Sequence, residues 1–239
     1  MRAALRQRCA EHATPLRIQR RDTLKAAAAW LALGGLPGAI AQQRGNIIEL
    51  TGDVLLNGQR LLPDQTVQTG DQIQTGPTTS LIFVIGDAAF QVRPDSRLSL
   101  ARGDALTSVS QLRLAAGAVA SVWGADSRHQ LILPGLSADF RDAGLYAEVS
   151  EKYERRSYLC NCYGTLALSA GEDRRVSTST YHQAFWAASE KRPGDALMPA
   201  DNRHHTDGEL AFLARLISQK PAWQRSGPEG AMGAIDLLD

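Results

Sequence analysis

The stretch LIFVIGDAAFQV, residues 81–92, indicates how this chain folds. Leu81 to Ile85 form a continuous apolar run of strand length, which is typical of a strand buried on both faces. Gly86-Asp87 is a turn signal. Phe90 and Val92 then resume the period-two alternation of a half-buried strand. This pattern predicts two β-strands joined by a short turn.

The same alternation of short apolar segments and turn residues extends in both directions. Residues 54–61 predict a hairpin, because Asn57-Gly58 supplies the two positive-φ positions of a tight turn. Further along, apolar residues on both sides of residues 115–117 predict two strands separated by a turn at Gly117. We therefore expect a mainly β domain over residues 46–190, either a twisted β-sandwich or a β-solenoid-like fold.

One helix is predicted near the C-terminus. Thr206 and Glu209 have the spacing of a capping box, and Leu210, Leu213 and Ile217 then form an apolar stripe. This pattern predicts a C-terminal α-helix over residues 206–220, ended by a proline. A linker at 191–205 is expected before the helix and a flexible tail at 221–239 after it.

The N-terminal residues have the features of an export signal. Arg20-Arg21 and Lys25 precede an uncharged apolar run over residues 26–36, and small residues follow at Ala39 and Ala41. This order predicts a cleavable signal peptide over residues 1–41. The arginine pair resembles the twin-arginine consensus, and an ordinary signal with an incidental arginine pair is the alternative. We expect a periplasmic protein with no stable membrane span after cleavage.

Removal of residues 1–41 changes the charge and the cysteine count. The sum of Lys and Arg falls from 26 to 19 and that of Asp and Glu from 25 to 23, so the net charge moves from +1 to −4. No basic block remains, which argues against a nucleic-acid partner. Cys9 leaves with the signal, and Cys160 and Cys162 are then the remaining thiols.

The order of the turn motifs resembles that of the FecR-type periplasmic domain family. The matching residues are Gly52-Asp53-Val54, Leu56-Asn57-Gly58, Gly70-Asp71, Thr75-Gly76, Gly86-Asp87, Pro94-Asp95-Ser96 and Leu114-Ala115-Ala116-Gly117-Ala118-Val119. Arg141-Asp142-Ala143-Gly144 departs from the family, which has Arg-Gly-Thr at this place.

This resemblance implies an exported, non-enzymatic β domain that acts as a binding or signalling and scaffold module, with a protein or small-ligand partner that is not identified. In signalling members of the family, a cytoplasmic anti-sigma segment and a membrane helix precede the domain. We expect this chain not to be a sigma regulator of that kind. The absence of a Gly-x-Ser-x-Gly elbow and of a defensible carboxylate pair agrees with a protein that is not an enzyme.

Cys160 and Cys162 have three interpretations. A disulfide between them would be strained, because extended i and i+2 residues lie about 6.6 Å apart, whereas disulfides prefer a Cα separation of about 5.5–6 Å. On a strand, both side chains point to one face. There they are either two buried core thiols or half of a soft-metal site that needs one or two further ligands.

Histidines are the candidates for those further ligands. His182 follows the cysteines by about one hairpin, and His205 stands just before the predicted helix. The chain is similar here to sequences in which Cys-x-Cys-Tyr-Gly precedes a His and a His-Thr-Asp-x-Glu-Leu helix start. That resemblance implies a Cys2His2-type site for zinc or iron, built from Cys160, Cys162, His182 and His205, with a metal-sensing or electron-transfer role.

The simpler alternative is that the cysteines are structural and His182 is an ordinary surface residue. His129 is expected in a solvated turn and His204 in the linker. A Cys-x-x-Cys-His motif is absent, so c-type haem is not supported.

Overall fold

The computed structural model describes residues 45–105, 107–150, 156–188 and 196–225. Within these ranges the strands form one sheet, in which all neighbours pair antiparallel except β8 and β9. The strands are β1 (Ile47–Thr51), β2 (Val54–Leu56), β3 (Gln59–Arg60), β4 (Gln72–Thr75), β5 (Ser80–Ile85), β6 (Ala88–Val92), β7 (Arg97–Arg102), β8 (Val109–Trp123), β9 (His129–Leu133), β10 (Leu136–Ser150), β11 (Arg156–Ala170), β12 (Asp173–Ser179), β13 (Gln183–Ala187) and β14 (Leu197–Ala200). The helical elements are α2 (Asp207–Leu216) and the 3₁₀ helix η1 (Ala222–Gln224). The prediction of a mainly β chain with one C-terminal α-helix is confirmed for the described residues, and the expected signal peptide at 1–41 lies outside them.

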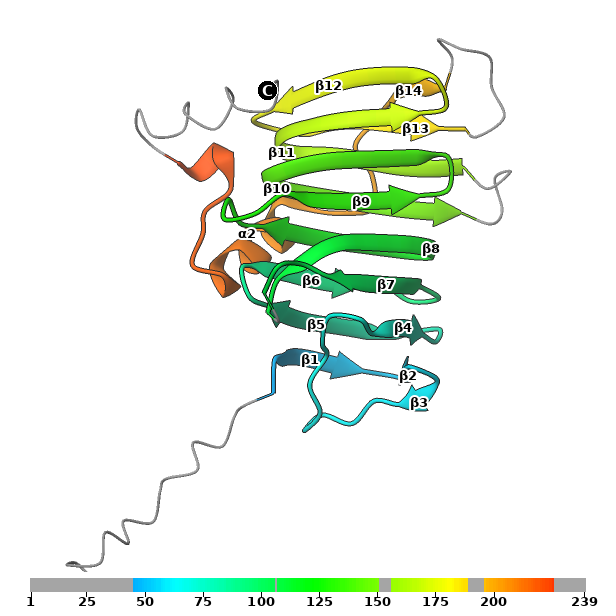
Figure 1. The fold of residues 1–239 in the computed structure, drawn as a ribbon, viewed down its shortest axis with the longest axis vertical. Coiled ribbons are helices and arrows are strands. Elements are labelled where there is room, and N and C mark those ends of the chain that lie inside the picture. The colour runs from blue at the N-terminus through cyan, green and yellow to red at the C-terminus, as the bar shows by residue number, and fades with distance from the viewer. Residues whose placement is uncertain (1–44, 106, 151–155, 189–195, 226–239) are drawn as a thin grey trace, which may run out of the picture. The chain divides into compact units, whose positions relative to one another are not determined.

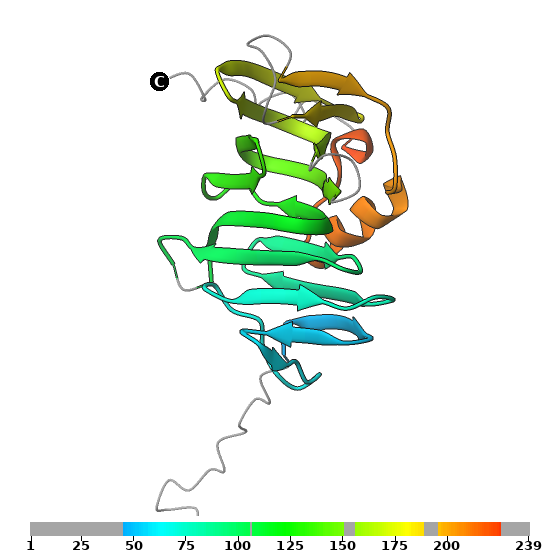
Figure 2. The same cartoon turned by 90° about the vertical axis from the view of Figure 1, so that its right-hand side faces the viewer.

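Three long strands hold this sheet together (Figures 1 and 2). The strands β8, β10 and β11 have 15 residues each, and each pairs with different neighbours along its two halves. The first half of β8 pairs with β7 and its second half with β6. In the same way β11 pairs first with β13 and then with β12. Each long strand therefore belongs to two arms of the sheet. One arm contains β1, β5, β6, β13 and β14, the other contains β2, β3, β4, β7, β9 and β12, and the core lies between the arms.

The long strands bend where the two arms meet. Gly117 in β8 has a φ of +79°, Asp142 in β10 a φ of +38° and Gly164 in β11 a φ of +106°. At Gly117 an added Cβ would overlap Ser96, so only glycine fits both the conformation and the space. The turn predicted at residues 115–117 is therefore wrong. The chain bends there but remains a strand, because the residues on both sides stay paired.

The inner core explains why the stretch 81–92 has its apolar pattern. Phe83 in β5 and Phe90 in β6 are both fully buried, and their rings stack with centroids 4.9 Å apart. The edge of Trp123, at the end of β8, meets the ring of Phe90 at 4.9 Å. Ile82 is also buried, but it belongs to a second cluster on the outer face of the sheet. Because both faces of this arm are covered, the strand is apolar at successive positions.

The C-terminal elements differ in part from their predicted bounds. The capping box is confirmed, because the Thr206 side chain accepts from the Glu209 backbone and the Glu209 side chain accepts from the Thr206 backbone. The helix α2 ends at Leu216, earlier than expected, because Ser218 takes a φ of +60° that ends the helical path. No helix among the described residues is long and apolar enough to cross a membrane.

The segment predicted as a linker, 191–205, contains a strand. Leu197–Ala200 form β14, which pairs antiparallel with β13. Pro199 stands opposite Phe185 in this pairing. Proline argues against a central strand but is tolerated at the edge of a sheet, where β14 lies.

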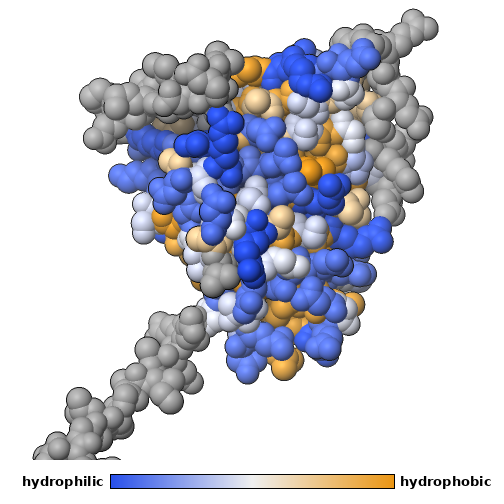
Figure 3. All heavy atoms as spheres, viewed as in Figure 1, coloured by the Kyte–Doolittle hydropathy of each residue, from blue (hydrophilic) through white to orange (hydrophobic). Residues whose placement is uncertain are grey.

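Exposed large apolar side chains are most frequent in the first hairpins of the sheet. Ile48, Leu55 and Leu62 are 49%, 37% and 49% exposed and belong to β1, β2 and the segment after β3. Apolar area is visible at this end of the molecule in Figure 3, and further apolar areas are visible between hydrophilic residues elsewhere on the same face. The exposed apolar side chains of these hairpins are separate from the cysteine and histidine residues described next.

Candidate metal centre

Cys160 and Cys162 lie on the outer face of β11, and both are fully buried. Asn161 between them points to the other face, where its side-chain amide donates to the backbone oxygen and the hydroxyl of Ser177 at 3.0 and 2.9 Å. The strand is irregular here, because Tyr163 pairs with Gly144 whereas Asn161 pairs with the next residue, Leu145. The alternation of the strand therefore places both thiols on the same side, as predicted.

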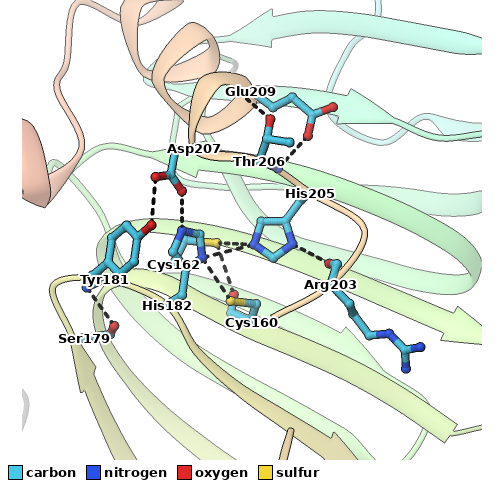
Figure 4. A network of polar contacts seen from close by, with 10 residues as sticks. All are labelled: Cys160, Cys162, Ser179, Tyr181, His182, Arg203, His205, Thr206, Asp207 and Glu209. Atoms are coloured by element: carbon cyan, nitrogen blue, oxygen red, sulfur yellow. Dashed lines mark hydrogen bonds and ion pairs between the residues drawn. The ribbon is translucent and has the colours of Figure 1, made fainter. Parts of the chain in front are cut away.

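The two candidate histidines approach the cysteines from two different segments (Figure 4). His182 lies in the turn between β12 and β13, with a φ of +40°, and its backbone N–H donates to the Cys162 oxygen at 3.0 Å. His205 lies directly before Thr206, the N-cap of α2. Because the capping box fixes the start of the helix, it also fixes the direction in which His205 enters.

The four side chains converge on one point. The Sγ of Cys160 lies 3.5 Å from Nδ1 of His182, and the Sγ of Cys162 lies 3.4 Å from Nε2 of His205. The same two nitrogen atoms are 3.2 Å apart, and all four ligand atoms lie within 4.8 Å of one another. In a tetrahedral zinc site with ordinary bond lengths, the S–N edges are about 3.5 Å and the N–N edge about 3.3 Å. The three distances of 3.5, 3.4 and 3.2 Å match edges of such a tetrahedron, and the limit of 4.8 Å for the whole set requires only a small adjustment on binding.

The outer nitrogen of each imidazole is held by an acceptor. Nε2 of His182 donates to Oδ1 of Asp207 at 2.8 Å, and Nδ1 of His205 donates to the backbone oxygen of Arg203 at 2.7 Å. Since these nitrogen atoms carry the hydrogen of a neutral ring, the other nitrogen of each ring presents a lone pair to the centre. Histidine ligands of metal ions are oriented in the same way, by a carboxylate or a carbonyl at the far nitrogen.

The thiols and the imidazoles also influence each other's protonation. The hydrogen bond from Cys162, together with those from His182 and His205, lowers the pKa of the Cys160 thiol well below its usual range against the opposing effect of burial. Burial raises the pKa of Cys162, and the neighbouring Cys160 raises it further. The hydrogen bond with Cys160 raises the pKa of His182, with burial opposing and Asp207 assisting. Without a metal ion, the cluster therefore favours the ionised form of Cys160 and the protonated forms of Cys162 and His182.

Aromatic side chains close the site from solvent. Tyr146 stacks on His205 with centroids 4.6 Å apart, and Trp223 stacks on His182 at 5.5 Å. The side chain of His182 is 4% exposed, and His205 is 8% exposed as a whole residue. The four groups thus form a closed site, of the kind that zinc occupies in structural centres rather than in catalytic ones.

The residues around the four candidates were not predicted from the sequence. In the sequence, Asp207 is recognisable only as a residue of the first turn of the predicted helix. No spacing connects it with His182, which lies 25 residues earlier. Tyr146 and Trp223 come from β10 and η1. Their aromatic character alone gives no signal of a role beside a metal centre.

The remaining described histidines do not join the cluster. The sequence predicted His129 in a solvated turn, and this prediction is wrong. His129 is 2% exposed at the start of β9, where its Nδ1 donates to the Val109 oxygen at 2.8 Å. It packs between the rings of Trp123 and Phe140. Nδ1 of His204 contacts Oε2 of Glu148 at 2.7 Å instead.

Comparison with known proteins identifies no family for this chain. No protein-family model and no curated protein sequence matches it. Two crystal structures of a candidate anti-sigma factor from Parabacteroides distasonis ATCC 8503 are similar over 54% and 56% of this chain, with TM-scores of 0.43 and 0.44 and 7% identity. The matched part spans 59% and 60% of the length of those chains. These values are too low to assign a family or a function.

Proposed function

We propose that this chain is an exported, non-enzymatic metal-binding protein that holds one zinc or iron ion between Cys160, Cys162, His182 and His205. The observation that carries the proposal is the convergence of two thiols and two imidazole lone pairs at the separations of a tetrahedral site. Two soft sulfur ligands with two imidazoles suit zinc or iron and do not suit magnesium or calcium.

The closed geometry favours a structural or metal-sensing role. Catalytic zinc sites leave one position open for water or substrate, whereas this site offers four protein ligands and is covered by Tyr146 and Trp223. A bound zinc ion has no redox chemistry, so a zinc site would serve metal sensing or a structural role. An iron site could also serve electron transfer.

The FecR-type interpretation and the export of the chain are part of the same proposal. The family-like motifs occupy turns and bends of the sheet, which supports their assignment as turn-forming segments. Asn57 and Gly58 take φ values of +53° and +80°, and Asp95 takes +53°. In this interpretation the β domain is a periplasmic binding or signalling module. The export signal and the periplasmic location rest on residues 1–41 alone.

Elemental analysis of the chain tests the metal site directly. We expect the untagged full-length protein to contain about one zinc or iron ion per chain, and the identity of the ion to decide between the two. The substitution His205→Ala removes one imidazole ligand and should lower the metal content severalfold under mild chelation. His204→Ala is the matched control, since His204 is the adjacent histidine but contacts Glu148 rather than the cluster. Equal metal loss in both variants, or no metal in the wild type under reducing conditions, would contradict the proposal.

Metal binding should release protons, and acid should weaken it. The raised pKa of His182 and of Cys162 favours the protonated form of each group in the metal-free cluster. A metal ion needs the deprotonated ligands and displaces these protons, so the affinity should rise with pH and fall in acid. Calorimetry in buffers of different ionisation enthalpy measures the number of protons released. Binding without proton release would show that the ion does not use the thiols.

A further inference from the structure

The C-terminal segment of residues 203–225, called the C-terminal cover below, supplies the metal site with three of its parts. These are the ligand His205, the acceptor Asp207 and the ring of Trp223 that stacks on His182. Cys160 and Cys162 belong instead to β11, and His182 belongs to the turn before β13. Figure 4 shows the cover entering from the helix side and the other ligands rising from the sheet. The site therefore lies at the seam between the cover and the sheet.

The cover also buries the outer face of one arm of the sheet. Leu210, Leu213 and Ala214 of α2 are fully buried in the outer cluster, which includes Val122 and Tyr146 of the sheet. The inner core between the two arms contains no residue of the cover among those described. The sheet thus has a core of its own, and the cover has none without the sheet.

Apart from the site, few polar contacts fasten the cover. Arg93 pairs with Glu209 at 2.6 Å, Arg225 pairs with Asp142 at 2.6 and 2.7 Å, and His204 contacts Glu148 at 2.7 Å. The side chains of these pairs are between 18% and 54% exposed, and ion pairs that water reaches stabilise a fold only weakly. A metal ion would instead add a bond to His205 of the cover and three bonds to ligands of the sheet.

The geometry of the cluster makes the ion more than one contact among many. Nδ1 of His182 and Nε2 of His205 face each other at 3.2 Å, and the other nitrogen of each ring already donates to an acceptor. Without an ion, His205 meets the ligands of the sheet through contacts of 3.2 Å to Nδ1 of His182 and 3.4 Å to Sγ of Cys162. An ion would instead link His205 to all three ligands of the sheet through coordinate bonds. Separation of the rings is then easiest on the side of the cover, because His182 is tied to β11 through its backbone.

We propose that the metal ion pins the C-terminal cover to the sheet, and that loss of the ion releases the cover while the inner core stays folded. This inference rests on the proposed metal site and adds what the ion controls. Release of the cover exposes the outer apolar face around Ile82, Val122 and Tyr146. Metal binding thereby decides whether this apolar face is covered or exposed, and a metal-responsive module requires such a change of surface.

Hydrogen–deuterium exchange of the untagged full-length protein tests this inference, with the zinc-loaded form compared with the chelated form in a reducing buffer. We expect backbone amides of α2 and of the segment around Trp223 to exchange about tenfold faster or more after chelation. Amides of β7 and of the first half of β8 should change by less than about twofold, because they belong to the inner core. Glu209→Gln is the matched variant, since it removes the charge that pairs with Arg93 and keeps a capping side chain.

Each outcome has a definite meaning. Faster exchange confined to the cover, in the chelated wild type but not in zinc-loaded Glu209→Gln, supports the inference. Unchanged exchange of the cover after measured loss of the ion overturns the inference and leaves the metal site intact. Equal loss of protection in the inner core, or release of the cover in zinc-loaded Glu209→Gln, also overturns it. Failure to take up any zinc refutes the proposed function itself, and elemental analysis of the same samples identifies that case.

Discussion

Replacement of Cys162 by serine is expected to abolish stoichiometric metal binding. Cys162 is fully buried, and its sulfur faces Nε2 of His205 at 3.4 Å. A serine hydroxyl stays protonated at neutral pH and is a poor ligand for zinc or iron, so the site loses one of its two thiolates and keeps Cys160 and the two histidines. We expect the affinity to fall by at least about a hundredfold, and the melting temperature in the presence of zinc to fall with it by mass action. Competition with a chromophoric chelator measures the affinity.

A matched variant separates loss of the ligand from the introduction of a hydroxyl. Ala184 is 6% exposed in the same outer cluster and stands opposite Cys160 in the pairing of β11 with β13. Ala184→Ser therefore places an added hydroxyl on the same face without removing a ligand, and it should retain about one ion per chain. If Cys162→Ser kept the affinity of the wild type, the two cysteines would be buried core thiols and the metal site would be refuted.

Replacement of Trp123 by alanine is expected to cause the largest loss of stability among single substitutions in the inner core. The ring is fully buried and contacts Phe90, Phe140 and His129 at centroid distances of 4.9, 5.4 and 4.8 Å. Its Nε1 donates to the Ser121 hydroxyl at 2.8 Å. Removal of such a side chain costs about 3–5 kcal/mol, because contacts are lost and the cavity is only partly refilled. In a domain of this size we expect a fall in melting temperature of roughly 10 °C.

Trp186→Ala is the comparison for Trp123→Ala. Trp186 is only half-buried and packs at the margin of the outer cluster, where its ring meets Tyr158 at 5.2 Å. We expect a loss of stability of about half that of Trp123→Ala or less, since part of its ring is already in water. Both variants should keep the metal ion, because neither tryptophan is one of the four candidate ligands. A larger effect at Trp186 than at Trp123 would contradict the placement of the core between the two arms.

Local chemistry explains which parts of the fold were predictable. The hairpin at Asn57-Gly58 and the capping box of Thr206 depend on neighbours within a few residues, and both formed as predicted. The bend at Gly117 has the same local signature as a turn. It remains a strand only because β6 and β7, which are distant in sequence, pair with its two sides.

The strand β14 was missed for a related reason. Its residues have no strong alternation, and Pro199 argues against a strand. The pairing with β13 at the edge of the sheet supplies the missing stabilisation, and an edge position does not need the N–H that proline lacks.

The sequence by itself determined the local elements and the ligand types. The alternation of β11 places Cys160 and Cys162 on one face, and His205 stands before a capped helix, so both halves of the candidate site are visible in the linear chain. Only the tertiary structure decided that these halves meet, because the partners of the two cysteines lie 22 and 43 residues away and no local rule connects such distances. Packing of the C-terminal cover on the outer face of the sheet brings His205, Asp207 and Trp223 to the cysteines. The burial of apolar area that drives this packing depends on the complete sheet, which is why the sequence could name the ligands but not their surroundings.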